Sequence, residues 1–257
     1  MWTVGLWKNP AMERPIAVVT GASSGFGAAT ARQLAAAGFD VICAARRADR
    51  IDALATEIGG RAVVADITSA ADVARLADAA GPSIAVLVNN AGGALGQEPV
   101  GDADLAAWES MWRTNVLGTA LVTKALLPAV LAAQGAIVFV TSTAADWGYE
   151  GGAGYCGAKA AERSMVESMR LELFDKPIRV MEICPGMAKT DGFALTRYGG
   201  DQARADAVYA GVADPLSADD VADAIVWMAT RPAHVNIDRL VVRPLAQAAN
   251  HKVFRTA

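Results

Sequence analysis

The stretch from Ile16 to Gly27 constrains the fold more than any other part of the chain. It opens with Ile-Ala-Val-Val-Thr, a run typical of a strand that is buried on both faces of a parallel sheet. The strand leads directly into a glycine-rich turn and then into an alanine-rich helical pattern. A strand, a glycine turn and a helix in this order favour nucleotide binding, because glycines let the backbone approach a pyrophosphate and the helix N-terminus offers free N–H groups.

The glycine spacing in this turn is G-x-x-x-G-x-G rather than the G-x-G-x-x-G of the dinucleotide fingerprint. A plain connection between a strand and a helix therefore stays open as an alternative. If the turn holds a cofactor, the residues expected to contact it are Gly21, Ser23, Ser24, Gly25, Phe26 and Gly27.

Strand and helix patterns alternate along the rest of the chain, which indicates an α/β fold. Further strands are predicted at 40–45, 61–65, 84–88, 135–141, 178–183 and 239–243. We expect a single Rossmann-type doubly wound domain over 15–257, with a seven-stranded, mostly parallel sheet and helices on both faces. Residues 1–14 match nothing that follows and are interpreted as an N-terminal extension.

The predicted second strand ends at Ala45 and is followed by Arg46 and Arg47. A site that prefers NAD usually ends this strand with a carboxylate for the ribose hydroxyls, whereas two guanidiniums suit a 2′-phosphate. The pattern therefore predicts NADP(H) in preference to NAD(H). The alternative is that both arginines open the next helix and pair with Asp49 or Asp52.

The ends of two other strands offer further candidates for the cofactor site. Asp66 follows the third strand, where it would border an adenine, and an Asn-Asn-Ala-Gly sequence follows the fourth. The residues expected to contact a cofactor here are Asp66, Ile67, Asn89, Ala91 and Gly92.

A hydroxyl, a phenol and an amine follow the fifth strand. Ser142 ends that strand, and Tyr155 and Lys159 are spaced to lie on one face of a helix. An ammonium a few ångströms from a phenol lowers the pKa of the phenol from its free value of about 10, so that it can act as an acid or base near neutral pH. Taken singly, each residue could equally be structural. Asn115, inside a long apolar helical pattern, either serves a local kink or takes part in the chemistry.

A polar segment at about 187–214 follows the end of the sixth strand. A segment of this length after a strand is more typical of a lid than of a tight connection.

Composition narrows the class of partner. A net charge of −4 without runs of like charge argues against a nucleic acid or a membrane surface, and the apolar stretches are interpreted as too short to span a bilayer. Three cysteines and two histidines, without ligand spacing, argue against a metal site and suit the reducing cytoplasm. We expect a cytoplasmic protein with a small-molecule partner.

Six motifs together resemble the short-chain dehydrogenase/reductase family over about residues 15 to 245. They are Thr20-Gly-Ala-Ser-Ser-Gly-Phe-Gly27, Asn89-Asn-Ala-Gly92, Asn115, Ser142, Tyr155-x-x-x-Lys159 and Pro185-Gly186-x-x-x-Thr190. The resemblance implies that Tyr155 exchanges a proton with the substrate oxygen, that Lys159 holds the nicotinamide ribose and that Ser142 orients the carbonyl. It implies that Asn115 holds a water, that Pro185, Gly186 and Thr190 contact the cofactor together with Tyr155 and Lys159, and that the protein is a homotetramer.

Three longer segments look like the NADP-dependent branch that oxidises serine and 3-hydroxy acids and reduces semialdehydes. They are 89–96 with Glu98-Pro99, 142–149 with Gly151-Gly152, and 231–237. This resemblance implies anionic substrates, with Arg197 as their clamp beside Ser142 and Tyr149; the alternative for Arg197 is a solvated lid charge. The branch often carries an acid before the Pro-Gly pair, where this chain has Cys184, and this departure suggests a less polar pocket.

The sequence thus predicts an NADP(H)-dependent oxidoreductase that interconverts an alcohol and a carbonyl, with a small 3-hydroxy acid or semialdehyde as substrate. A ketoreductase of β-ketoacyl thioesters or bulky apolar ketones is the first alternative, and a non-catalytic NADP-binding regulator is another. An epimerase or dehydratase of nucleotide sugars would need a larger C-terminal domain than this chain has room for.

Overall fold

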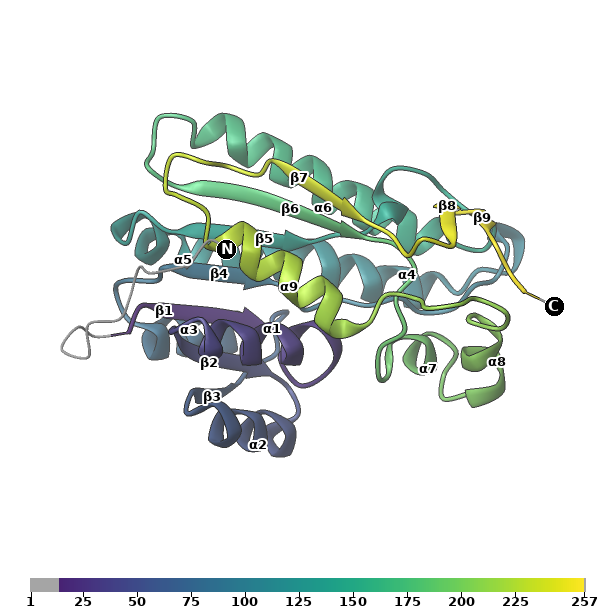
Figure 1. Ribbon diagram of the computed structural model, residues 1–257, viewed down its shortest axis with the longest axis horizontal. Helices are drawn as coiled ribbons and strands as arrows, with labels where there is room; N and C mark the ends of the chain where they lie inside the picture. Colours follow the sequence, from purple (N-terminus) through teal and green to yellow (C-terminus); the bar gives the residue numbers. More distant parts are fainter. Residues whose placement is uncertain (1–13, 257) are drawn as a thin grey trace.

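The computed structural model describes residues 14–256, and its centre is a seven-stranded parallel sheet of order β3-β2-β1-β4-β5-β6-β7 (Figure 1). The strands are β1 (Ile16–Thr20), β2 (Asp40–Ala45), β3 (Arg61–Val64), β4 (Val86–Asn89), β5 (Ala136–Val140), β6 (Arg179–Pro185) and β7 (Arg239–Val242). The predicted fold class is confirmed, and each predicted strand is present with its ends shifted by at most two residues.

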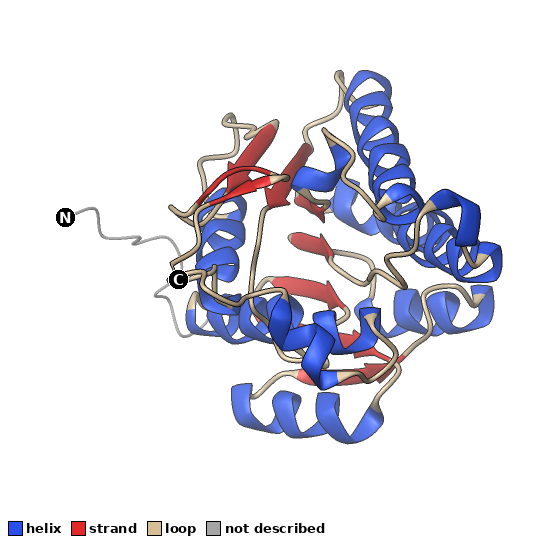
Figure 2. Ribbon diagram, turned by 90° about the vertical axis from the view of Figure 1, so that its right-hand side faces the viewer, coloured by secondary structure: helices blue, strands red, loops and turns tan. Residues whose placement is uncertain are grey.

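Helices cover both faces of the sheet, as Figure 2 shows. The helices are α1 (Gly25–Ala36), α2 (Ala48–Ile58), α3 (Ala70–Ala80), α4 (Leu105–Trp112), α5 (Thr119–Ala132), α6 (Ala153–Glu172), α7 (Phe193–Arg197), α8 (Gln202–Ala207) and α9 (Ala218–Ala229). Successive strand residues point to opposite faces. Val41 and Cys43 of β2 therefore join a core with α1, α2 and α9, whereas Ile42 joins a second core with α3, α5 and α6.

The strand order places the functional loops together. From β1 the chain moves outward to β2 and β3, then returns to β4 on the other side of β1. In an open parallel sheet, a crevice forms outside the carboxyl ends of the strands at such a switch point. The loops after β1 to β6 all begin at this edge.

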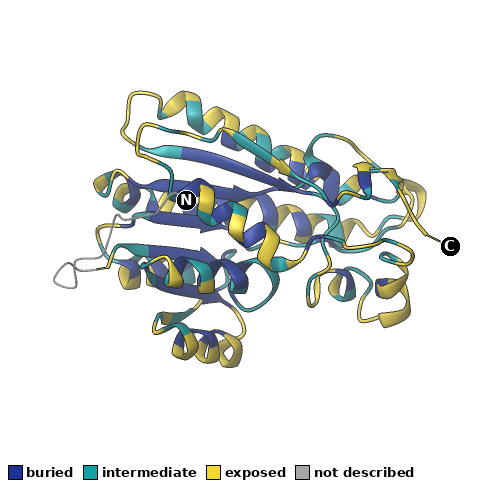
Figure 3. Cartoon of the chain, in the orientation of Figure 1, coloured by how far each residue is buried: buried dark blue, intermediate teal, exposed yellow. Residues whose placement is uncertain are grey.

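Segment 187–214 contains the short helices α7 and α8, whose outer surfaces are largely exposed (Figure 3). A two-stranded hairpin, β8 (Gln247–Ala249) with β9 (Lys252–Val253), follows the main sheet and was not predicted. The proposed N-terminal extension lies outside the described residues except for Arg14, which donates hydrogen bonds to the carbonyls of Ala35 and Gly38 at 3.3 Å each.

One expectation about apolar length is wrong. The continuous helical stretch Leu105–Ala132 has 28 residues and a mean hydropathy of 1.6, long and apolar enough to cross a membrane by these two criteria. Core helices of soluble proteins meet the same criteria, and α5 contributes Val122 and Leu126 to the second core. The expectation of no membrane partner therefore stays a prediction.

Candidate active site

A cavity of about 1140 Å³ lies at the carboxyl edge of the sheet. Its walls come from the loops after β1 to β6, from the segment with α7 and α8, and from the hairpin residue Gln247. Pockets for small ligands are typically about 300–1,000 Å³, so this one has room for a dinucleotide and a small substrate together.

The glycine turn after β1 forms one end of the cavity. Gly21 and Gly25 have φ angles of +68° and +52°, in the left-handed region that glycine adopts readily. Five of the six residues predicted in this turn line the cavity, namely Gly21, Ser23, Ser24, Gly25 and Phe26. Gly27 does not, and a Cβ there would lie 2.4 Å from the carbonyl oxygen of Gly21. Gly27 therefore permits α1 to pack against the turn.

Arg47 lies beside the two serines of this turn. Its guanidinium donates to the hydroxyl of Ser23 at 2.8 Å and to that of Ser24 at 2.7 Å. Arg46 and Arg47 are both exposed and both line the cavity. Within residues 14–256 neither arginine forms an ion pair with Asp49 or Asp52. The cluster of guanidiniums and hydroxyls suits a phosphate group.

The residues after β3 also line the cavity. Asp66 accepts hydrogen bonds from the backbone N–H and the hydroxyl of Thr68, at 2.8 and 2.7 Å. Its own backbone N–H donates to Asp72, and this bond is the main reason why the pKa of Asp72 is lowered. The Asp66 carboxylate is thus engaged by hydrogen bonds within its own loop. Asp66 and Ile67 both line the cavity.

Of the two adjacent asparagines at the end of β4, Asn89 is the last strand residue, and the structure places the second, Asn90, in the cavity wall. Asn89 is buried, does not line the cavity and donates to the hydroxyl of Thr123 at 2.9 Å. Asn90 lines the cavity together with the predicted residues Ala91 and Gly92, and donates to the carbonyl of Thr20 at 2.9 Å. Asn89 therefore supports the wall from behind, because neighbouring strand residues face opposite sides.

Thr20, for which the sequence suggested no separate role, joins the ends of β1 and β4. Its hydroxyl accepts from the backbone N–H groups of Asn90 and Ala91 at 3.0 Å each, and donates to the carbonyl of Val88 at 3.2 Å. A buried threonine followed by a glycine turn is the signal that could have identified it.

Ser142, Tyr155 and Lys159 all line the cavity. Helix α6 presents Tyr155 and Lys159, both nearly buried, one turn apart. The hydroxyl of Ser142 accepts from the backbone N–H of Ala144 at 3.1 Å and donates to the carbonyl of Pro185 at 3.4 Å. A hydroxyl, a phenol and an ammonium thus share one wall.

Lys159 has a buried acidic partner that the sequence interpretation missed. Its ammonium donates to Glu162 at 2.7 Å and to the carbonyl of Val140 at 3.0 Å. Burial alone would lower the pKa of Lys159, but the Glu162 carboxylate outweighs this effect, with a smaller contribution from Tyr155, and raises the pKa above its usual range. An acid three residues after the lysine is the signal that could have identified it.

Asn115 lies in a π-helical turn, η2 (Arg113–Gly118), between α4 and α5. Its side-chain amide donates to the carbonyls of Met111 and Gly93 at 2.8 and 3.0 Å and accepts from the N–H of Gly93 at 3.1 Å. The helix is thus locally irregular at Asn115, and the amide is engaged by backbone groups, while a part in the chemistry stays a prediction. A Cβ on Gly92 would lie 2.4 Å from the Asn115 oxygen and 3.5 Å from the Lys159 nitrogen, so only a glycine fits between them.

Arg197 reaches the cavity from α7. It donates to the phenol oxygen of Tyr149 at 2.9 Å and to the carbonyl of Gly96 at 3.0 Å, and its guanidinium lies 6.0 Å from the ring centre of Tyr155. Its remaining Nη2 is buried and has no partner among residues 14–256. Burial raises the pKa of Tyr149 to about 12, although Arg197 opposes the shift, so this phenol stays protonated at neutral pH.

Cys184 does not make the cavity less polar. It is fully buried and lies outside the cavity wall, with its sulfur 3.3 Å from the Thr141 hydroxyl and 3.2 Å from Nε of Arg239. The expectation of a less polar pocket, based on this residue, is wrong, because the following residue of β6, Pro185, lines the cavity instead, whereas Ile183 is buried in the core. Pro185, Gly186 and Thr190 do line the cavity.

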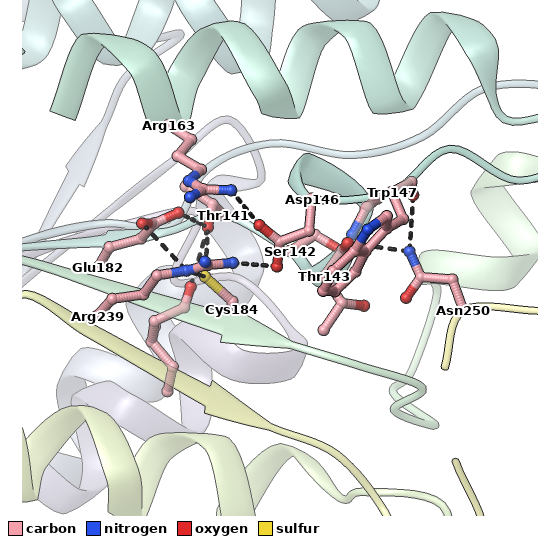
Figure 4. A network of polar contacts seen from close by, with 12 residues as sticks. Thr141, Ser142, Thr143, Asp146, Trp147, Arg163, Glu182, Cys184, Arg239 and Asn250 are labelled. Atoms are coloured by element: carbon pink, nitrogen blue, oxygen red, sulfur yellow. Dashed lines mark hydrogen bonds and ion pairs between the residues drawn. The ribbon is translucent and has the colours of Figure 1, made fainter. Parts of the chain in front are cut away.

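A charged network holds the turn that carries Ser142 (Figure 4). Asp146, whose side chain is 6% exposed, accepts from Arg163 of α6 and from Arg239 of β7. Asn250, in the turn between β8 and β9, donates to the carbonyls of Thr143 and Trp147 at 2.9 and 2.8 Å. The turn is thus attached to three separate elements.

Comparison with known proteins agrees with this arrangement. The model of the short chain dehydrogenase family matches residues 15–198. An uncharacterized oxidoreductase of Mycobacterium tuberculosis is 56% identical over 250 residues, covering 97% of this chain and 96% of that protein. Serine 3-dehydrogenase of Agrobacterium fabrum is 42% identical over 245 residues, covering 93% and 97%.

A solved structure is also closely similar. The closed form of a serine dehydrogenase complexed with NADP⁺ has a TM-score of 0.87 and 36% identity, covering 94% of this chain and all of that one. The chain belongs to the short-chain dehydrogenase family, and it is an oxidoreductase.

Proposed function

We propose that this protein is an NADP(H)-dependent oxidoreductase. It interconverts the alcohol and carbonyl forms of a short acid, such as a 3-hydroxy acid and the corresponding semialdehyde. The observation that carries the substrate class is the buried Nη2 of Arg197, which has no hydrogen-bond partner in the described part of the chain and belongs to a guanidinium near the Tyr155 ring at the cavity wall. A carboxylate on the substrate would satisfy that donor while the reacting carbon lies by the phenol. The similarity to serine 3-dehydrogenase supports the same class.

The residues present fit NADP(H). Arg46, Arg47 and the hydroxyls of Ser23 and Ser24 would hold the 2′-phosphate, since charge-assisted donors of this kind favour a phosphate over a ribose hydroxyl. Lys159 would hold the nicotinamide ribose, and the turns that carry Gly25 and Thr190 would enclose the rest. The solved relative that contains NADP⁺ supports this assignment.

Bound NADPH supplies a hydride to the carbonyl carbon. During reduction Tyr155 donates its phenolic proton to the carbonyl oxygen, and the Ser142 hydroxyl donates a hydrogen bond to the same oxygen. The ammonium of Lys159 stabilises the phenolate that remains. The π-helical turn at Asn115 keeps the loop at Gly92 close to Lys159, so it shapes the wall beside the ammonium.

We infer that residues 15–257 form a single domain. Within it, segment 187–214 acts as a lid over the cavity. Its helices α7 and α8 are exposed on their outer side, and Arg197 connects the lid to the carbonyl of Gly96 and to Tyr149. With these contacts formed, the lid would hold the Arg197 donor at the substrate and exclude water from the reacting atoms.

We also propose that the protein works as a homotetramer in the cytoplasm. The edge strand β7 and the helix α9 expose Val241 and Trp227, and α4 exposes Trp112. An exposed sheet edge with large apolar side chains favours coverage by another chain. The three cysteines are free thiols, as expected in a reducing compartment. Light scattering would give the mass of the particle.

The test is NADPH oxidation with malonic semialdehyde, succinic semialdehyde, an acetoacetyl thioester and an apolar ketone, with NADH in parallel. The proposal predicts the highest kcat/KM for NADPH with the short acid semialdehydes. Turnover confined to the thioester or the apolar ketone would contradict it and favour a ketoreductase. No turnover with any carbonyl would favour a non-catalytic regulator.

A further inference from the structure

Lys159 and Glu162 form a buried ion pair directly behind the cavity wall. Their side chains are 5% and 2% exposed, and their charged atoms are 2.7 Å apart on successive turns of α6. An ammonium has three N–H donors. Glu162 and the carbonyl of Val140 take two of them, which leaves one for the cavity that Lys159 lines.

Glu162 is unusual because the reaction as described above does not require it. A buried ion pair adds little or nothing to stability compared with apolar side chains of similar size, because both charges must lose their water. Its neighbours Ala158 and Val166 on α6 belong to the apolar cores. A carboxylate at this position therefore suggests a role toward the ammonium rather than in packing.

Other titratable groups that influence the pKa values of this pair come from two elements. Tyr155 of helix α6 helps to raise the pKa of Lys159. From strand β6, Cys184 also helps to raise the pKa of Lys159, and Glu182 helps to raise the pKa of Glu162. Within residues 14–256, Glu162 is the carboxylate that forms an ion pair with Lys159.

We propose that Glu162 is a positioning residue that keeps the buried Lys159 protonated and fixed against β5, so that its charge remains available to Tyr155. Without the carboxylate, an isolated ammonium in this place would lose its proton more easily, because burial disfavours the charged form. This inference rests on the proposed function, in which the Lys159 charge stabilises the Tyr155 phenolate.

The first experiment measures unfolding by urea from about pH 7 to about pH 10 and needs no substrate. In Glu162→Gln the pKa of Lys159 should fall below that of the unfolded chain, so the variant should be most destabilised near neutral pH. The difference in the free energy of unfolding between variant and wild type should shrink by at least about half towards pH 10, because over this range the unfolded chain still binds the lysine proton that the folded variant has lost, so rising pH favours the folded variant. A loss in the free energy of unfolding of Glu162→Gln that stays constant over this pH range would overturn the inference.

Three variants separate charge from shape. Glu162→Asp keeps the carboxylate. Its free energy of unfolding should lie closer to that of wild type, with a difference that does not depend on pH. Glu172→Gln, at the exposed end of the same helix, should match wild type throughout.

If Glu162→Gln does not fold, the double variant Lys159→Met/Glu162→Gln should fold, because it leaves no buried charge unpaired. Failure of the double variant as well would contradict the inference, since the unpaired ammonium would not be the cause.

The second experiment is the pH profile of kcat/KM for carbonyl reduction. The active form needs protons on both Tyr155 and Lys159, so Glu162→Gln should move the alkaline limb to lower pH by about one unit or more. An unchanged limb would contradict the inference. If no carbonyl is turned over at all, the proposed function fails, whereas the unfolding experiment still decides the role of Glu162.

Discussion

Arg197 donates a hydrogen bond to the phenol oxygen of Tyr149 at 2.9 Å and so connects α7 to the loop that follows Ser142. The same guanidinium lies 5.4 Å from the ring centre of Tyr149 and 6.0 Å from that of Tyr155. The Arg197 guanidinium therefore lies next to the wall that carries the proposed acid, at a distance suited to a substrate only a few atoms long.

Replacing Arg197 with Leu should weaken the use of acidic substrates selectively. Loss of a charge-assisted hydrogen bond costs about 1.5–3 kcal/mol, so kcat/KM for malonic semialdehyde should fall about 10- to 150-fold. An uncharged aldehyde of the same length should be affected far less. The control is Arg231→Ala, an arginine that lies over Trp227 and does not line the cavity. Equal losses for both aldehydes would mean that Arg197 does not recognise the anion.

Exchanging Arg46 and Arg47 for Ala should change cofactor preference. The double variant removes Arg47, which donates to Ser23 and Ser24, and Arg46, which also lines the cavity, so the Kd for NADPH should rise about 10- to 100-fold. The Kd for NADH should change little, because NADH has no 2′-phosphate. Fluorescence titration measures both constants, with the exposed Arg50→Ala as control. A similar loss for both cofactors would contradict the assignment.

Replacing Asp146 with Asn should loosen the turn that carries Ser142. The amide cannot neutralise Arg163 and Arg239, so we expect the free energy of unfolding to fall by about 1–3 kcal/mol, a reduced value because both arginines are partly solvated. Turnover should also fall, whereas NADPH affinity stays close to wild type. Glu167→Gln removes only the half-exposed partner of Arg163 and should cost less than about 0.5 kcal/mol. Urea unfolding compares the variants, and equal stability of the two would refute the role of Asp146.

Alkaline pH should destabilise the fold through its buried thiols. Burial raises the pKa of Cys43 from 9.0 to about 11, and that of Cys184 by a similar amount. Because the folded pKa is the higher one, this stabilisation is fully present below pH 9 and is lost as pH rises from about 9 to about 11. Urea midpoints should fall over this window, and Cys43→Ala should show a smaller decline. The same decline in the variant would show that the thiol is not its source.

Much of the fold could be predicted because apolar strands buried on both faces leave a strong local signal. Ile16–Thr20 and Asp40–Ala45 are strands with the predicted ends. The hairpin at Gln247–Ala249 has no such signal, because its strands are short and their place depends on contacts from Asn250 to the loop after β5.

The site was predictable where function imposes a residue pattern, and less so where packing decides. The motif residues Ser142, Tyr155 and Lys159 line one cavity, as their spacing suggested. The sequence predicts a cofactor contact at Asn89, because two adjacent asparagines look alike in the sequence. Strand alternation turns only the second, Asn90, to the cavity. Asp146 and Arg239 lie 93 residues apart, so no local pattern shows that they meet.

The most direct test is the turnover of Tyr155→Phe with NADPH and malonic semialdehyde. The variant keeps the ring but has no proton to donate, so kcat should fall about 10²- to 10⁴-fold, whereas the Kd for NADPH stays close to wild type. Turnover close to wild type, with the cofactor bound normally, would show that Tyr155 is not the acid and would contradict the mechanism.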